Sequence, residues 1–246
     1  MYHRVKVKPM EKKNNMKSMI AQERPYEKFE RFGAANLTDV ELLAILLRTG
    51  TKGESALSLA EKILYPVFSH DGILNIHSWT PEQLLQLRGI GRVKAIQIAC
   101  LCELSKRLAK ATAGKELNFS TPSSIANYYM EDMRHAKQEI MKLLLLNTKS
   151  RLIGESNISK GTVNASLVSP RELFIEALQK NAVSIILLHN HPSGDPMPSK
   201  EDVLLTKRVS DAGGLIGITL LDHIIIGNQC YCSLREQGLF TVTKES

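Results

Sequence analysis

Two histidines and an aspartate lie close together in the sequence, at a spacing that could hold a metal ion. His189 and His191 follow 184–188, a short aliphatic run typical of a buried strand. Residues two apart on an extended chain point to the same side, so both imidazoles can face one point. Asp202 comes in the first turn of a helix that the sequence predicts from about Lys200 to Ala212. Two imidazoles and one carboxylate leave a fourth position for water, as in catalytic rather than structural zinc sites.

The segment between the histidines and the aspartate predicts a tight loop that ends in a helix N-cap. Four residues that favour turns interrupt it, namely Pro192, Gly194, Pro196 and Pro198. Ser199 then stands at the N-cap position, and Asp202 follows three residues later. A Ser-x-x-Asp pair also forms an ordinary capping box, and an aspartate is favoured at the positive end of a helix dipole. Each residue alone therefore has a structural explanation, whereas the joint spacing favours a metal site.

The complete pattern, Glu…His-x-His-x7-Ser-x2-Asp, resembles the signature of JAB/MPN (JAMM) zinc metallopeptidase domains. The run His-Asn-His-Pro-Ser-Gly-Asp-Pro over 189–196, with Asp-His-Ile-Ile over 222–225, is similar to the RadC-like bacterial branch of these domains. The resemblance extends from about Glu23 to Phe240. It implies an α/β fold, a cytidine-deaminase-like mixed sheet with flanking helices.

The resemblance also implies a role for each motif residue. His189, His191 and Asp202 would hold zinc, and the ion would lower the pKa of a bound water from about 15.7 to about 7. Glu155, which aligns with the glutamate of the motif, would be the general base for that water. Ser199 would help to stabilise the tetrahedral oxyanion. Spacing alone does not select Glu155, because a glutamate on a strand is usually a solvated residue.

Composition limits the class of protein. The chain of 246 residues is long enough for one or two domains, and its hydrophobic fraction of 43% suffices for a core. No apolar run approaches the roughly 18 residues of a membrane span, and the charged N-terminus lacks a signal region, so we expect a cytoplasmic protein. The four cysteines form two Cys-x-Cys pairs, Cys100/Cys102 and Cys230/Cys232, which fit buried thiols better than a zinc knuckle. The formal charge of +7 permits attraction to nucleic acid or another acidic partner.

The N-terminal half predicts a basic arm followed by a helical domain. Residues 1–20 are rich in lysine and arginine and lack apolar periodicity, so we expect a flexible arm. Residues 21–112 follow as helices, with capping boxes at Thr38–Glu41 and Thr80–Gln83. Residues 109–118 lack an apolar stripe and predict the linker to a second domain.

The segment 84–95 resembles a helix-hairpin-helix motif, with Gly-Ile-Gly between two helices. Glycines allow the backbone to turn sharply, and the free N–H groups at the start of the second helix can receive a phosphate. Five residues would contact non-specific DNA, namely Arg88, Gly89, Gly91, Arg92 and Lys94. The alternative is an ordinary packing corner between two helices.

The C-terminal domain, 118–246, alternates expected strands and helices and closes with hairpin strands. The strands are expected at 140–146, 152–158, 184–188, 218–221, 223–226 and 231–233, and the helices at 123–133, 170–180 and 200–212. This order favours a mixed α/β sheet behind a small all-α domain. His223 is expected to be a buried core histidine rather than a fourth metal ligand, because an open catalytic site has three protein ligands.

Three functions compete on these grounds. The leading hypothesis is a zinc-dependent metallopeptidase that hydrolyses amide or isopeptide bonds in a peptide or protein substrate, with a helical module that binds DNA. The second is a DNA-binding protein associated with DNA repair, whose metal site is structural or vestigial. A scaffold that uses the fold only for protein contacts is disfavoured, because such domains usually lack the metal ligands. The sequence predicts no membrane partner.

Overall fold

The computed structural model describes residues 23–67, 69, 71–115, 117–161 and 168–242, and the expected basic arm 1–20 lies outside them. The chain divides into two compact units, Met1–Glu103 and Leu104–Ser246, which we name the N-terminal unit and the C-terminal unit. The division falls inside the helix Arg92–Gly114. This helix includes 109–114 of the expected linker. Alanine and lysine, which are frequent there, are strong helix formers. Within the described ranges, no helix is both long and apolar enough for a membrane crossing.

Short helices around one apolar core form the N-terminal unit. They are α1 (Pro25–Phe32), the 3-10 helix η3 (Ala34–Asn36), α2 (Asp39–Leu47), α3 (Ala56–Leu64), the 3-10 helix η4 (Gly72–Ser78), α4 (Pro81–Leu85) and the first part of α5 (Arg92–Gly114). Both expected capping boxes form, Thr38 with Glu41 at the start of α2 and Thr80 with Gln83 at the start of α4. These caps satisfy backbone N–H groups that the first turn of a helix leaves without a partner.

A mixed five-stranded sheet forms the centre of the C-terminal unit, in the order β2-β1-β3-β4-β5. The strands are β1 (Glu139–Leu146), β2 (Leu152–Gly161), β3 (Ser184–Asn190), β4 (Thr219–Ile226) and β5 (Tyr231–Ser233). β3 and β4 are parallel, and the other neighbours are antiparallel. A parallel pair needs a long crossover connection, which the helix between β3 and β4 provides. The expected α/β fold class is confirmed.

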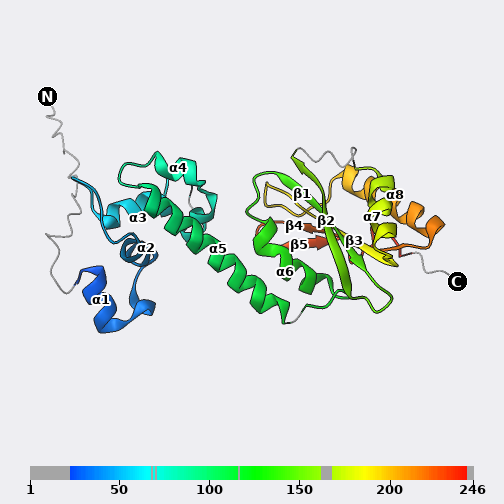
Figure 1. The fold of residues 1–246 in the computed structure, drawn as a ribbon, viewed down its shortest axis with the longest axis horizontal. Helices are drawn as coiled ribbons and strands as arrows, with labels where there is room; N and C mark the ends of the chain where they lie inside the picture. The colour runs from blue at the N-terminus through cyan, green and yellow to red at the C-terminus, as the bar shows by residue number, and fades with distance from the viewer. Residues whose placement is uncertain (1–22, 68, 70, 116, 162–167, 243–246) are drawn as a thin grey trace, which may run out of the picture. The chain divides into compact units, whose positions relative to one another are not determined.

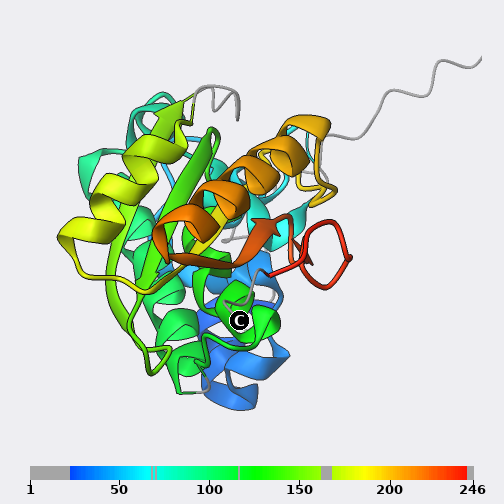
Figure 2. The same cartoon turned by 90° about the vertical axis from the view of Figure 1, so that its right-hand side faces the viewer.

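Helices cover both faces of this sheet (Figures 1 and 2). Helix α6 (Pro122–Met133) packs on one face, against even-numbered residues of β1 and β3 such as Leu144. Helices α7 (Pro170–Gln179) and α8 (Lys200–Ile216) cover the other, against odd-numbered residues of the same strands such as Leu143. Since side chains alternate along a strand, the even-numbered residues of β1 and β3 lie on the α6 face and the odd-numbered residues of these two strands lie on the α8 face.

Helix α8 continues past its expected end at Ala212 and stops at Ile216. Gly213 lies inside the helix, and this position requires glycine because a Cβ atom there would come within 2.3 Å of the carbonyl oxygen of Ile218. The helix ends at Gly217, whose φ of 72° is left-handed and favours glycine. The two strands expected at 218–221 and 223–226 are likewise a single strand, β4.

Candidate metal centre

His189, His191 and Asp202 converge at the end of β3 and the start of α8. The ligand atoms that they offer all lie within 4.8 Å of one another. The Nε2 atoms of the two histidines are 3.1 Å apart. The carboxylate of Asp202 faces both rings, with Oδ1 3.3 Å from Nε2 of His189 and Oδ2 3.5 Å from Nε2 of His191. The structure therefore brings together the three residues that the sequence predicted as metal ligands.

The loop after β3 orients the ring of His191. The backbone N–H of His191 donates to the carbonyl of Ile226 on β4 across 3.0 Å. Its ring Nδ1 lies 2.8 Å from the carbonyl oxygen of Asp195. A carbonyl only accepts, so Nδ1 carries the hydrogen and Nε2 of the neutral ring keeps its lone pair toward Asp202. Gly194, with a φ of 83°, permits the sharp turn that brings this carbonyl to the ring nitrogen.

A complete capping box orients Asp202 at the N-terminus of α8. The backbone N–H of Ser199 donates to Oδ2 of Asp202 across 2.8 Å, and its hydroxyl donates to the same oxygen across 2.6 Å. The backbone N–H of Asp202 donates in return to Oγ of Ser199 across 3.1 Å. These bonds gather on Oδ2 and leave Oδ1 directed at His189. Capping the helix and binding a metal are therefore compatible roles for this pair.

Burial and hydrogen bonding set the charges of the three ligands. His189 is 1% exposed, and burial lowers its pKa to about 4, so its ring is neutral at pH 7. Burial opposes the charge of Asp202, yet its bonds with His191 and Ser199 bring its pKa well below the usual range. The carboxylate of Asp202 lies 3.5 Å from Nε2 of His191 and raises the pKa of His191, because it favours the protonated ring. A cation is thus favoured between these groups, and two imidazoles with a carboxylate are a donor set that fits zinc.

Glu155, the expected general base, lies on the other face of the sheet. It stands opposite Leu144 in the pairing of β2 with β1, on the α6 face. Its Oε2 accepts a hydrogen bond of 2.5 Å from Oη of Tyr129, and its Oε1 is 3.5 Å from Nζ of Lys142. His189 is an odd-numbered residue of β3 and therefore lies on the α8 face. It pairs with Met141 of β1, whereas Glu155 pairs with Leu144. The structure does not bring Glu155 to the metal ligands, and the prediction of its role is corrected.

Glu139, the first residue of β1, is the acid that the structure brings to this centre instead. The pairing of β1 with β3 places Met141 opposite His189, and Glu139 lies two residues earlier on the same face. It is half-buried. Its pKa is raised, first by burial and then by the charge of Asp202, while the charge of His191 opposes the rise. The one signal for Glu139 in the sequence is its place as a charged residue directly before the apolar run 140–146.

The side chain of Asn190 fixes the backbone on both sides of Glu139. Asn190 is fully buried between the two histidines of the motif. Its Oδ1 accepts from the backbone N–H of Ile140 across 2.8 Å, and its Nδ2 donates to the carbonyl of Gln138 across 3.3 Å. A side chain thereby continues the hydrogen-bond ladder between β1 and β3. The position of Glu139 is thus tied directly to the segment that carries the metal ligands.

Two of the residues predicted to contact DNA bond to the backbone of their own unit. The ammonium of Lys94 donates to the carbonyls of Thr49 and Gly89, the latter across 3.0 Å, and burial lowers its pKa. Nη2 of Arg88 donates to the carbonyl of Lys52 across 3.3 Å. These bonds connect the hairpin between α4 and α5 to residues 49–52, which lie between α2 and α3, and this gives both side chains a structural role.

The other hairpin residues are arranged for a sharp turn and an open helix start. Gly89 has a φ of 94°, and a Cβ atom there would lie 3.0 Å from the side chain of Leu59. Gly91 and Arg92 are exposed at the N-terminus of α5. The expected hairpin geometry is therefore present, with the backbone of Gly91 and the side chain of Arg92 on the surface.

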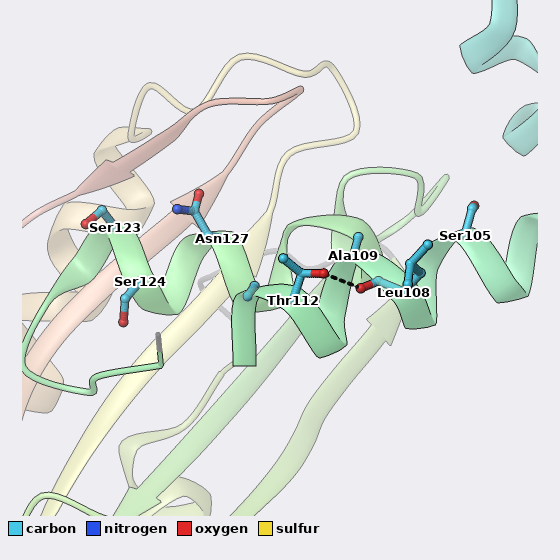
Figure 3. A pocket seen from close by; sticks show the side chains of 8 residues that line it. Ser105, Leu108, Ala109, Thr112, Ser123, Ser124 and Asn127 are labelled. Atoms are coloured by element: carbon cyan, nitrogen blue, oxygen red, sulfur yellow. Dashed lines mark hydrogen bonds between the residues drawn. The ribbon is translucent and has the colours of Figure 1, made fainter. Parts of the chain in front are cut away.

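A hollow of about 580 Å³ in the C-terminal unit lies between the last turns of α5 and the start of α6 (Figure 3). Small neutral side chains line it, among them Ser105, Ser124 and Asn127. The hydroxyl of Thr112 donates to the carbonyl of Leu108 across 3.0 Å and is occupied within the helix. No ionisable side chain is among the described residues that line this hollow, so it offers no acid–base or metal chemistry.

Comparison with known proteins assigns both halves of the chain. Residues 119–239 match the family model of the RadC-like JAB domain, and residues 16–96 match that of the UPF0758 N-terminal domain. A UPF0758 protein of Clostridium botulinum strain Hall is 46% identical over 229 residues, which are 93% of this chain and 99% of the relative. A UPF0758 protein of Clostridium tetani is 46% identical over 217 residues, 88% of this chain and 94% of the relative. The chain therefore belongs to the UPF0758 family, and its C-terminal unit carries a RadC-like JAB domain with a His-His-Asp cluster that could hold a metal ion.

Proposed function

We propose that the C-terminal unit is a zinc-dependent hydrolase of peptide or isopeptide amide bonds. The convergence of His189, His191 and Asp202 carries this proposal, because three ligands at one corner of the fold leave a coordination position open. Zinc, when bound, supplies a Lewis acid that lowers the pKa of water and polarises a carbonyl. A site with four protein ligands would instead favour a structural role.

Glu139 is the residue best placed to act as the general base. It shares the α8 face with His189 and lies at the same end of the sheet. The charges of His191 and Asp202 both affect its pKa. A carboxylate whose pKa is raised accepts a proton more readily than an ordinary one, which suits a base that works near neutral pH. The two bonds from Asn190 to neighbouring backbone groups hold this residue in place.

Ser199 has the position to support the developing charge of an oxyanion. Its hydroxyl is 2.6 Å from the carboxylate of Asp202 and therefore lies within the ligand cluster. An oxyanion-hole donor contributes about 3 kcal/mol to lowering the barrier in other enzymes. The capping bond, which Oγ accepts from the backbone N–H of Asp202, does not use the hydroxyl hydrogen, so this hydrogen can turn toward a substrate while the cap is retained.

Metal content and hydrolysis of defined probes test this function. The purified full chain should retain about one equivalent of zinc after dialysis and cleave either a fluorogenic peptide mixture or a lysine isopeptide probe. Asp202→Ala should lose both properties, whereas Glu201→Ala, which removes an exposed acid from the same helical turn, should keep both. Zinc retained by Asp202→Ala, or no cleavage of any probe by the zinc-loaded chain, contradicts the proposal.

A second candidate function is binding of non-specific DNA by the N-terminal unit. The exposed start of α5 favours it, because free backbone N–H groups beside Arg92 are suited to a phosphate. Affinity for duplex DNA should fall steeply with salt concentration and fall further in Arg92→Ala. DNA binding that is the same in Arg92→Ala and in the wild-type chain contradicts this candidate.

A further inference from the structure

A buried chain of hydrogen bonds leads from the back of His189 to the backbone of α8. Nδ1 of His189 is 2.8 Å from Nε2 of His223, on β4. Nδ1 of His223 is 2.6 Å from Oγ1 of Thr206, and this hydroxyl donates to the carbonyl oxygen of Asp202 across 2.6 Å. All four residues are buried, with exposed fractions of 1% for His189, 0% for His223, 1% for Thr206 and 4% for Asp202. The chain therefore begins at one metal ligand and ends at the backbone of another.

The direction of these bonds follows from the last acceptor. The carbonyl of Asp202 can only accept, so the single hydrogen of the Thr206 hydroxyl is used there. The hydroxyl oxygen must then accept the hydrogen on Nδ1 of His223. His223 is 0% exposed, and burial disfavours a charged ring, so the ring is neutral and its Nε2 has a lone pair. That lone pair accepts a hydrogen from Nδ1 of His189.

We infer that Thr206 and His223 are positioning residues that fix the tautomer of His189, so that its Nε2 offers a lone pair to the ligand cluster. Nδ1 of His189 carries the ring hydrogen in this arrangement, and the same neutral ring has no hydrogen left for Nε2. In the neutral ring of His191 the carbonyl of Asp195 selects the same tautomer separately. Both histidines are thereby prepared to bind a cation before one arrives.

His223 does not act as a ligand in this scheme. It contacts the nitrogen of His189 that faces away from His191 and Asp202, so it lies behind the first histidine and not beside the cluster. This position agrees with the expectation of a buried core histidine and gives that histidine a task. Residues that orient a ligand in this way typically change metal affinity by about 10- to 100-fold when they are replaced.

The inference rests on the proposed metal centre, but the tautomer can be measured without any metal. In the metal-free wild-type chain, long-range proton–nitrogen NMR correlations of the histidine rings should show His189 and His223 with the hydrogen on Nδ1. A hydrogen on Nε2 of His189 overturns the inference. This measurement needs no substitution and is decisive even if a variant fails to fold.

Removal of the hydroxyl of Thr206 tests the same point through affinity. Thr206→Val keeps the shape of the side chain but removes the acceptor for His223, so His189 should lose its single tautomer. Affinity for added Zn²⁺ should fall about 10- to 100-fold. Thr206→Ser keeps the hydroxyl and should bind like the wild type. Ser210→Ala, which removes another buried hydroxyl from α8, is the matched control and should also bind normally.

The outcomes separate this inference from the proposed function. If the wild type binds Zn²⁺ and Thr206→Val binds it equally well with an unchanged tautomer of His189, the inference is wrong and the metal centre stands. If the wild type binds no Zn²⁺, the proposed function fails, while the NMR measurement still decides whether the tautomer is fixed. Normal affinity in Thr206→Ser together with loss in Thr206→Val supports the inference.

Discussion

Tyr129 donates a hydrogen bond of 2.5 Å to Glu155, and this bond holds Glu155 on the face of the sheet opposite His189. Tyr129 comes from α6 and is fully buried, whereas the side chain of Glu155 is 40% exposed on β2. Lys142 on β1 lies 3.5 Å from the same carboxylate. Glu155 therefore connects β2 to Tyr129 of α6 and to Lys142 of β1.

Replacement of Glu155 should affect stability and leave the metal centre intact. Glu155→Gln keeps an acceptor for Tyr129 but loses the charge that strengthens the bond, so the free energy of unfolding of the C-terminal unit should fall by about 1 kcal/mol or less. Exposure of Glu155 to solvent limits the loss. Hydrogen exchange of amides in β1 and β2 measures the change, and zinc content should equal that of the wild type. Loss of zinc from this variant would restore Glu155 as a residue of the metal centre.

The stability contributed by Glu155 should disappear in acid. Burial works against the charge of Glu155, but the bond from Tyr129 and the charge of Lys142 bring its pKa below the ordinary 4.5. A carboxylate with a lowered folded pKa stabilises the fold above its unfolded pKa, and this contribution is lost as pH falls through the lowered value. The difference in unfolding free energy between wild type and Glu155→Gln should thus be constant at about pH 6–7. It should shrink as the pH falls below 4.5. A difference that grows in acid would contradict this account.

Glu139→Gln should separate metal binding from catalysis. Glutamine has the size of glutamate but cannot take a proton, so turnover should fall about 100- to 10,000-fold if Glu139 is the base. None of the three ligands is altered, so zinc content should remain at the level of the wild type. Glu155→Gln is the matched control, since it removes a carboxylate from the other face of the same sheet and should keep full activity. Equal turnover of the two variants would exclude Glu139 as the base.

The sequence was informative about the metal ligands because their geometry is local. The period of an extended chain predicts that His189, in β3, and His191, directly after β3, face one side, and a helix N-cap fixes Asp202 within the next turn. Glu139 joins them only through the antiparallel pairing of β1 with β3, which spans about fifty residues of chain. No local pattern records which strands become neighbours, so the sequence could not show that Glu155 lies on the other face of the sheet and that Glu139 lies on the face of His189.

The chain of hydrogen bonds from His189 through His223 and Thr206 could not be predicted from the sequence for the same reason. His223 is on β4 and Thr206 is on α8. Only the parallel pairing of β3 with β4 brings His223 to Nδ1 of His189. The end of α8 shows a related limit. A double glycine favours a helix stop, but tight packing against the carbonyl of Ile218 requires Gly213 inside the helix.

Replacement of Lys94 should weaken the N-terminal unit, because its ammonium closes the hairpin onto the carbonyls of Thr49 and Gly89. Lys94→Met keeps the apolar stem and removes both bonds, so the free energy of unfolding of this unit should fall by about 1–2 kcal/mol. The single tryptophan of the chain, Trp79, packs in the core of this unit, and its fluorescence during urea unfolding measures the change. Arg92→Met is the control, since that side chain is exposed and its replacement should leave the transition in place. A transition that shifts in Arg92→Met and not in Lys94→Met would mean that Arg92, rather than Lys94, stabilises the hairpin, and would return Lys94 to the residues available for DNA.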